Sequence, residues 1–337
     1  MKTIFCQHPG QLVLQDTDQP EEREGYSIIR VRKIGICGTD LHAFEGTQPY
    51  FSYPRILGHE LAGEIVQTDN SEFKTGEYVT ILPYFSCGTC VACRSGKPNC
   101  CVRIQVCGVH TDGGMREYFS VPTSSLVHSD GLTAEQLALV EPMAIGAHGI
   151  TRAGITDNDN VLVIGAGPIG LATIECARIA GAKLIVIDVN EQRLQFCRRI
   201  LGITDTINPL QEKAVDKLAD ITNGDMANVV IDATGNLSAI NQGFSFIAHG
   251  GRYILIGLQR GDISFSHPEF HKREATLMSS RNALRSDFEY VIRMIKEKKV
   301  DPLKFITDRI DFDQLPVKFE PLLDPANSVI KAVVSID

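Results

Sequence analysis

The pattern of hydrophobic positions changes near residue 160. From there on, continuous apolar runs at residues 161–164, 184–187, 229–231 and 253–256 alternate with segments of helical periodicity. Apolar runs without polar alternation are typical of strands that are buried on both faces, with the intervening helices as cover. The pattern therefore predicts an α/β fold with a doubly wound parallel sheet.

The first 145 residues show a different pattern, in which short β-branched runs are separated by glycine and proline. Such runs lie at residues 27–33, 61–66 and 78–82, and the opening residues alternate like a strand. They predict a mainly β, antiparallel and partly barrel-like domain. Thr133 and Gln136 form an expected capping box for a helix that runs towards Arg152. A helix at 286–298 and a β-rich tail at 333–336 complete the pattern.

Composition and charge exclude several classes of protein. The chain is 43% hydrophobic and 22% charged, which is typical of globular proteins, and its net charge of −8 includes no basic run, so nucleic acid is not an expected partner. No stretch approaches the roughly 18 apolar residues of a membrane span, and no signal-peptide core is present. We expect a cytoplasmic protein without a membrane partner. The uneven placement of ten cysteines in a long chain favours metal ligation over disulfides.

A glycine-rich turn follows the first apolar run and opens a helix. The spacing of Gly165, Gly167 and Gly170 matches the Rossmann dinucleotide fingerprint, in which the glycines allow a tight turn, approach of the pyrophosphate and close packing of helix on strand. The acid at the end of the next run should accept hydrogen bonds from the adenosine ribose and repel a 2′-phosphate, which favours NAD. The alternatives are a plain turn and a solvated or helix-capping carboxylate. The expected cofactor-binding residues are Gly165, Gly167, Pro168, Ile169, Gly170, Asp188 and Arg193.

Two groups of residues suggest metal sites with different chemistry. The closely spaced Cys87, Cys90, Cys93 and Cys101 can satisfy a tetrahedral zinc completely and leave no position for a substrate, which predicts a structural zinc. A catalytic zinc takes three protein ligands and keeps one position open, and a dispersed set of ligands could supply it. That set is Cys37, His59, Glu60 and Glu141.

The roles within the dispersed set stay partly open. Cys37, His59 and Glu141 would supply a thiolate, an imidazole and a carboxylate, and Glu60 is either a fourth, exchanging ligand or a partner outside the coordination sphere. The alternative without a metal is a core cysteine and a surface His–Glu pair.

These motifs occur in an order that resembles a known family. Residues 35–42 (GICGTDLH), 58–66 (GHELAGEIV), the four-cysteine lobe, 112–114 (DGG) and Glu141-Pro142 follow one another as in zinc-dependent medium-chain alcohol dehydrogenases. The resemblance covers nearly the whole chain. Because Glu141 stands where the classical alcohol dehydrogenases have a cysteine, the chain is most similar to the sorbitol and threonine dehydrogenase branch.

The resemblance implies the architecture, the cofactors and several roles. It implies a GroES-like catalytic zinc-binding domain at 1–146 and 287–337, a Rossmann NAD-binding domain at 147–286, two Zn²⁺ per chain, and a homodimer or homotetramer. It selects Cys101 over its neighbour Cys100 and leaves Cys6, Cys107, Cys176 and Cys197 as packing residues. Asp40 would orient the imidazole of His59, and Thr39 and His42 would form a proton relay.

The substrate is suggested by a narrower resemblance. Residues 267–283, with 48–54 and 109–114, resemble enzymes that oxidise L-galactonate or L-gulonate at C5. The expected reaction is therefore hydride transfer from a secondary alcohol of a sugar acid to NAD. Such a substrate needs a partner for its carboxylate, and Arg281 is the candidate because a guanidinium can hold a carboxylate bidentately. Asn282 and His110 are further candidates, and the alternative for Arg281 is a structural ion pair.

Other functions remain possible from the sequence. A polyol dehydrogenase of the sorbitol type and an L-threonine 3-dehydrogenase are the enzyme alternatives. A non-catalytic nucleotide-binding protein would be expected to have lost ligands or relay residues, and a quinone reductase would lack both metal sites. Both sets of ligands are intact in this chain.

Overall fold

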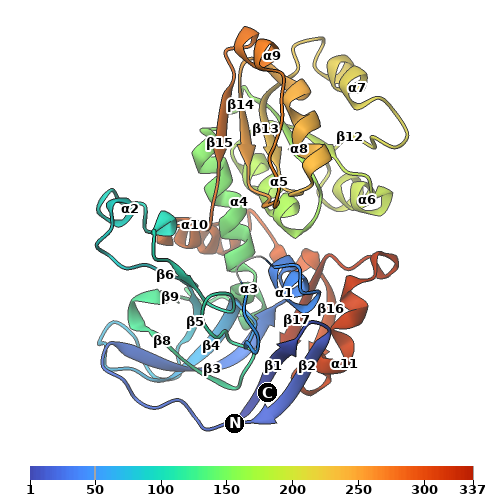
Figure 1. The fold of residues 1–337 in the computed structure, drawn as a ribbon. Helices are drawn as coiled ribbons and strands as arrows, with labels where there is room; N and C mark the ends of the chain where they lie inside the picture. The colour runs from blue at the N-terminus through green and yellow to red at the C-terminus, as the bar shows by residue number, and fades with distance from the viewer. Residues whose placement is uncertain (49–50, 337) are drawn as a thin grey trace. The chain divides into compact units, whose positions relative to one another are not determined.

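The chain folds into two compact units. The computed structural model describes residues 1–48 and 51–336 (Figure 1). One unit, here the β unit, comprises Met1–Glu141 and Ala283–Asp337. The other, here the α/β unit, comprises Pro142–Asn282. The tail of the chain thus returns to the unit in which the chain begins.

The α/β unit is built on a six-stranded sheet in the order β12-β11-β10-β13-β14-β15, with every neighbouring pair parallel. The chain starts at the central β10, moves outward on one side and then returns to fill the other, which is the doubly wound topology expected from the sequence. The strands are β10 (Asn160–Ile164), β11 (Lys183–Ile187), β12 (Asp205–Ile207), β13 (Ala227–Asp232), β14 (Ile247–Leu255) and β15 (Thr276–Ser279).

Helices alternate with these strands and explain their apolar composition. The central strand β10 is buried at four of its five positions because helices cover the sheet. The edge strands β12 and β15 contain no continuous apolar run and were not predicted. The helices are α4 (Val140–Ala153), α5 (Pro168–Ile179), α6 (Glu191–Ile200), α7 (Ala214–Ile221), α8 (Leu237–Gly243) and α9 (His267–Lys272), with the 3-10 helix η3 (Phe244–Phe246).

The main sheet of the β unit has the order β16-β17-β3-β4-β5-β9, with β8 also paired to β3. Its described pairs are antiparallel apart from β16 with β17, so two strands from the C-terminal tail extend a sheet formed by the first part of the chain. The strands are β3 (Tyr26–Gly35), β4 (Glu60–Gln67), β5 (Tyr78–Ile81), β8 (Tyr118–Pro122), β9 (Leu126–His128), β16 (Ile306–Asp311) and β17 (Lys331–Ser335).

Smaller elements surround this sheet. Two antiparallel strand pairs accompany it, β1 (Lys2–His8) with β2 (Gln11–Asp16) and β6 (Tyr84–Phe85) with β7 (Gln105–Val106). Its helices are α1 (Gly38–Phe44), α2 (Val91–Arg94), α3 (Ala134–Ala138), α10 (Arg285–Lys296) and α11 (Leu315–Lys318). The 3-10 helices are η1 (Pro98–Cys100), η2 (Thr123–Ser125), η4 (Pro302–Phe305), η5 (Phe312–Gln314), η6 (Glu320–Leu323) and η7 (Pro325–Asn327).

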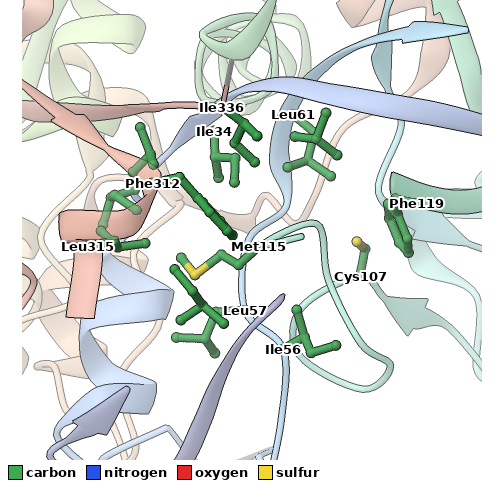
Figure 2. Packing of buried hydrophobic residues seen from close by; sticks show 14 of the residues in the cluster. Ile34, Ile56, Leu57, Leu61, Cys107, Met115, Phe119, Phe312, Leu315 and Ile336 are labelled. Carbon is green, nitrogen blue, oxygen red and sulfur yellow. The ribbon is translucent and has the colours of Figure 1, made fainter. Parts of the chain in front are cut away.

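The core of the β unit joins residues from both ends of the chain (Figure 2). Leu57 and Met115 are fully buried and belong to one cluster with Phe312 and Ile336 from the tail. Burial of large apolar side chains stabilises a fold by about 1.5–3 kcal/mol each. This shared core explains why the tail folds with the N-terminal part.

The predicted helix after Thr133 is divided in two. The capping box is present, since Thr133 Oγ1 accepts from the Gln136 N–H at 3.3 Å and Gln136 Oε1 accepts from the Thr133 N–H at 3.0 Å. However, α3 ends at Ala138 and α4 begins at Val140, so one continuous helix to Arg152 was wrong. The break places Glu141 in the first turn of α4. None of the helices in the described part of the chain is long and apolar enough to cross a membrane.

Candidate active site

The four-cysteine lobe brings its thiols together in the β unit. One sulfur from each of Cys87, Cys90, Cys93 and Cys101 lies within 4.8 Å of the others. Backbone N–H groups of Cys87 and Arg103 point to Cys101 Sγ at 3.3 and 3.4 Å. The Arg103 guanidinium beside Cys87 lowers the pKa of that thiol to about 5. Four converging sulfurs, one of them readily ionised, fit a closed tetrahedral zinc site.

The remaining cysteines lie elsewhere. Cys101 is buried whereas Cys100 is exposed, and Cys100 is not part of the four-sulfur group. All ten cysteines are free thiols. The four cysteines for which a packing role was expected are buried: Cys6, Cys107, Cys176 and Cys197.

A second group of ligand atoms converges where β3 ends and β4 begins. Single donor atoms of Cys37, His59 and Glu60 lie within 4.8 Å of one another. The antiparallel pairing of β3 with β4 sets Gly35 opposite Glu60. A Cβ added to Gly35 would lie 2.0 Å from Glu60 Oε2, so only glycine leaves room for this carboxylate. The group therefore depends on strand register as well as on its own side chains.

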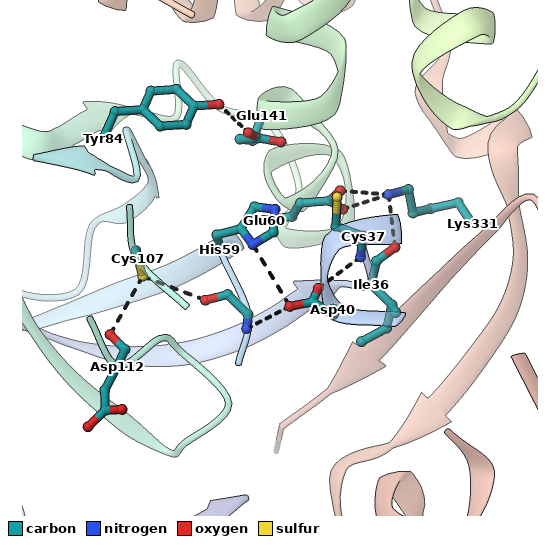
Figure 3. A network of polar contacts seen from close by, with 11 residues as sticks. Ile36, Cys37, Asp40, His59, Glu60, Tyr84, Cys107, Asp112, Glu141 and Lys331 are labelled. Carbon is teal, nitrogen blue, oxygen red and sulfur yellow. Dashed lines mark hydrogen bonds and ion pairs between the residues drawn. The ribbon is translucent and has the colours of Figure 1, made fainter. Parts of the chain in front are cut away.

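Asp40 connects the two chain segments that contain Cys37 and His59 (Figure 3). Its Oδ2 accepts from the Cys37 N–H at 2.9 Å, its Oδ1 accepts from the Gly58 N–H at 3.1 Å, and Oδ1 lies 3.9 Å from His59 Nδ1. Within residues 1–48 and 51–336, the buried His59 Nδ1 has no hydrogen-bond partner. Burial lowers the pKa of His59, but the electrostatic influence of the neighbouring Cys37 and Asp40 outweighs it, so the net shift of the pKa is upward. A thiol, an imidazole and a carboxylate at this spacing fit a zinc ion.

Two carboxylates of the candidate site, Glu60 within the group and Glu141 outside it, have protein partners that the sequence analysis missed. Lys331 Nζ donates to Glu60 Oε1 at 2.7 Å, to Oε2 at 2.8 Å and to the Ile36 carbonyl at 3.0 Å. The Tyr84 hydroxyl donates to Glu141 Oε1. Burial raises the pKa of Glu141 to about 7. Glu141 is not among the donors within 4.8 Å, whereas Glu60 is. The signal in the sequence for the role of Lys331 was a lysine directly before the apolar run at residues 332–334 of β17.

The residues expected to form the proton relay lie on one helix of the β unit, whereas those expected to bind the substrate are divided between the two units. Thr39 and His42 lie on α1, and the exposed His42 has its Nδ1 3.3 Å from both Glu45 Oε2 and Thr47 Oγ1. His110 Nδ1 accepts from the Val106 N–H at 3.1 Å. Arg281 and Asn282 follow β15 in the α/β unit, whereas the others belong to the β unit. Of the segment 48–54, Pro49 and Tyr50 lie outside the described residues.

The glycine turn has the geometry that its spacing predicts. Gly165 has φ of +97°, and a Cβ on Gly170 would lie 1.8 Å from the Gly165 carbonyl oxygen. The helix α5 begins at Pro168 with Gly167 as its N-cap. Its N-terminus thus follows directly from a turn that side chains would obstruct, as a pyrophosphate site requires.

Asp188 connects the glycine turn to the end of β11. Its carboxylate is buried and accepts from the Ala166 N–H at 2.6 Å and from the Asn190 N–H at 2.7 Å. Arg193 Nη1 lies 4.0 Å from it. The helix α6 is capped by Asn190. Asp188 is therefore neither a solvated carboxylate nor the cap of α6.

A β unit with two groups of candidate metal ligands and a doubly wound unit with a dinucleotide-type turn are the features of a metal-dependent, nucleotide-using dehydrogenase. The chain matches the alcohol dehydrogenase GroES-like domain over residues 23–131 and the zinc-binding dehydrogenase family over residues 168–297. It belongs to the zinc-dependent medium-chain alcohol dehydrogenases, enzymes that oxidise CH–OH groups with a nicotinamide cofactor. A non-catalytic nucleotide-binding protein is thereby set aside.

The relatives have names that span several substrates. L-galactonate-5-dehydrogenase of Escherichia coli (strain K12) is 41% identical over 99% of each chain. L-threonine 3-dehydrogenase of Pyrococcus abyssi is 32% identical over 91% of this chain and 90% of its own. Sorbitol dehydrogenase of Halalkalibacterium halodurans is 30% identical over 90% of each.

Solved structures show the same fold. An Escherichia coli alcohol dehydrogenase (rspB) complexed with NADH superimposes with a TM-score of 0.93 at 29% identity, covering 100% of this chain and 99% of its own. A zinc-binding dehydrogenase from Sinorhizobium meliloti bound to NADP superimposes with a TM-score of 0.92 at 26% identity, covering 99% of each.

Proposed function

We propose that this enzyme oxidises a secondary hydroxyl of a sugar acid, at C5 of L-galactonate or L-gulonate, with NAD as the hydride acceptor. The observation that carries the chemistry is the convergence of the half-buried Cys37 with the buried His59 and Glu60. Glu141 is a further buried carboxylate. The choice of substrate is supported by the 41% identity to a protein named L-galactonate-5-dehydrogenase.

Two zinc ions per chain are proposed. Cys37 and His59 would hold the catalytic ion together with a carboxylate from Glu141, and Glu60 would be an additional or exchanging ligand. A zinc ion bound there would supply a Lewis acid that lowers the pKa of the substrate hydroxyl and so favours hydride transfer to NAD. The four cysteines of the lobe would hold the structural ion.

The other residues of the site would position groups and move the proton. Asp40 keeps the Cys37 and Gly58 backbone in place and orients His59. Thr39 and His42 are proposed to carry the alcohol proton towards solvent.

Asp188 is proposed to determine the preference for NAD over NADP. The glycine turn would accept the pyrophosphate of the cofactor, and Arg193 would complete the pocket. The buried carboxylate of Asp188 would accept hydrogen bonds from the ribose and repel a 2′-phosphate. NAD should therefore be used in preference to NADP.

Arg281 is proposed to bind the carboxylate of the sugar acid, and Asn282 and His110 are proposed as further substrate contacts. Removing a charge-assisted bidentate partner in a desolvated site lowers kcat/KM by roughly a hundredfold. Arg281→Ala should show this loss with L-galactonate and little loss with the neutral sorbitol. The exposed Arg199 provides a matched control, since Arg199→Ala should leave both rates unchanged.

Initial rates with L-galactonate, L-gulonate, sorbitol and L-threonine test the proposal directly. The largest kcat/KM should be for one of the two aldonates with NAD. Preference for sorbitol would favour the polyol alternative, and preference for L-threonine would favour the activity in the name of the Pyrococcus abyssi relative. No turnover of either aldonate would refute the sugar-acid assignment.

A further inference from the structure

Tyr84 is held rigidly against the carboxylate of Glu141. Tyr84 lies on the short strand β6, which pairs with β7. Its ring contacts Phe288 of α10 edge to face, with centroids 6.4 Å apart and planes at 80°. Tyr84 is 7% exposed and Glu141 4% exposed. The phenol therefore has little freedom to turn away from the carboxylate.

The hydrogen bond uses one of the two oxygens of Glu141. The Tyr84 hydroxyl donates to Oε1 (Figure 3). A carboxylate whose one oxygen accepts a strong hydrogen bond presents the other oxygen to a cation. Glu60 differs from Glu141 in this respect, because the Lys331 ammonium contacts both of its oxygens. The two carboxylates of the site are thus restrained in different ways.

We propose that Tyr84 is a positioning residue that restricts Glu141 to a single free oxygen and thereby keeps a position on the catalytic metal open for the alcohol. This inference rests on the proposed function. Without the phenol, Glu141 could present both oxygens and occupy the position that the substrate needs. The neutral phenol also draws electron density from the carboxylate, which leaves the metal a stronger Lewis acid.

The test is Tyr84→Phe, which removes the hydroxyl and keeps the ring that packs on Phe288. With Co²⁺ in place of zinc, the visible absorption of Tyr84→Phe should differ from that of the wild type, because coordination by the second oxygen of Glu141 would alter the ligand field of the cobalt. The contribution of the four-cysteine site cancels in this difference. Tyr253→Phe is the matched control, since its buried hydroxyl donates to the Ile240 carbonyl at 3.1 Å in the α/β unit.

Catalysis provides a second readout. Tyr84→Phe should lower kcat/KM about 10- to 100-fold, the usual effect of losing a partner of a metal ligand. In a Glu141→Gln background the same substitution should have little further effect if Tyr84 acts through Glu141.

An unchanged cobalt spectrum in Tyr84→Phe would overturn the proposal. The proposal would also be overturned if Tyr84→Phe lowered kcat/KM by the same factor in the Glu141→Gln background as in the wild type. The cobalt measurement needs no substrate. It therefore tests Tyr84 even if the enzyme turns over no aldonate, a result that would refute only the sugar-acid assignment.

Discussion

The buried ion pair between Lys331 and Glu60 makes a sharp prediction about the metal-free protein. Lys331 is 3% exposed and Glu60 fully buried, and the ammonium contacts both carboxylate oxygens within 2.8 Å. Lys331→Met keeps most of the side-chain volume and deprives the Glu60 carboxylate of the ammonium that contacts both of its oxygens. Removing one partner of a buried pair costs about 3–5 kcal/mol. For a unit of this size, the melting temperature should fall by about 10 °C.

Zinc should reverse part of this loss. Because Glu60 lies within 4.8 Å of the Cys37 and His59 donors, a bound cation can replace the missing ammonium charge. Lys331→Met should therefore gain more stability from added zinc than the wild type does. Thermal unfolding followed by circular dichroism, first with a chelator and then with excess zinc, measures both effects.

Two variants separate the charge from the packing. Adding Glu60→Gln to Lys331→Met removes the uncompensated charge and should restore most of the stability of the metal-free protein. Lys2→Met is the matched control, because Lys2 pairs with Asp313 in the same unit with both side chains about half exposed, and its melting temperature should hardly change. A metal-free Lys331→Met protein as stable as the wild type would refute the reasoning, as would a double variant no more stable than the single one.

Further predictions concern the cofactor and the metals. Gly170→Ala should lower both the stability and the NAD affinity, because its Cβ meets the Gly165 carbonyl at 1.8 Å, whereas Gly167→Ala has room in the fold and should lower NAD affinity alone by isothermal titration calorimetry. Asp188→Asn keeps a hydrogen-bond acceptor and removes the charge, so the NAD/NADP ratio of kcat/KM should fall; an unchanged ratio would place the discriminating acid elsewhere. Cys90→Ser should reduce zinc from about two to about one per chain by elemental analysis and lower the melting temperature; two retained zincs would contradict a structural site there. Burial raises the pKa of Glu141 to about 7, so below that pH zinc must displace the Glu141 proton and zinc affinity should fall as the pH drops. In Glu141→Gln the fall of zinc affinity with pH should be shallower by about tenfold per pH unit. Equal pH dependence of zinc affinity in the wild type and in Glu141→Gln would exclude Glu141 as a ligand.

The sequence by itself determined the features that have local signatures. The buried strands β10, β11 and β13 could be predicted because strands covered on both faces are apolar without interruption. The glycine turn and the four-cysteine lobe could be predicted because each places its functional atoms within a few residues of one another. For the same reason the capping box at Thr133 was found.

The tertiary structure decided the contacts between distant parts of the chain. Lys331 and Glu60 are 271 residues apart, and Tyr84 and Glu141 are 57 residues apart, so no spacing rule relates either pair. The short edge strands β12 and β15 carry too little apolar pattern to be recognised, because one side of an edge strand lacks a neighbour. Local patterns report which residues are buried and which turns are possible, whereas strand pairing and core packing determine which buried groups meet. The protein partners of Glu60 and Glu141, the two carboxylates of the candidate metal site, are of this second kind.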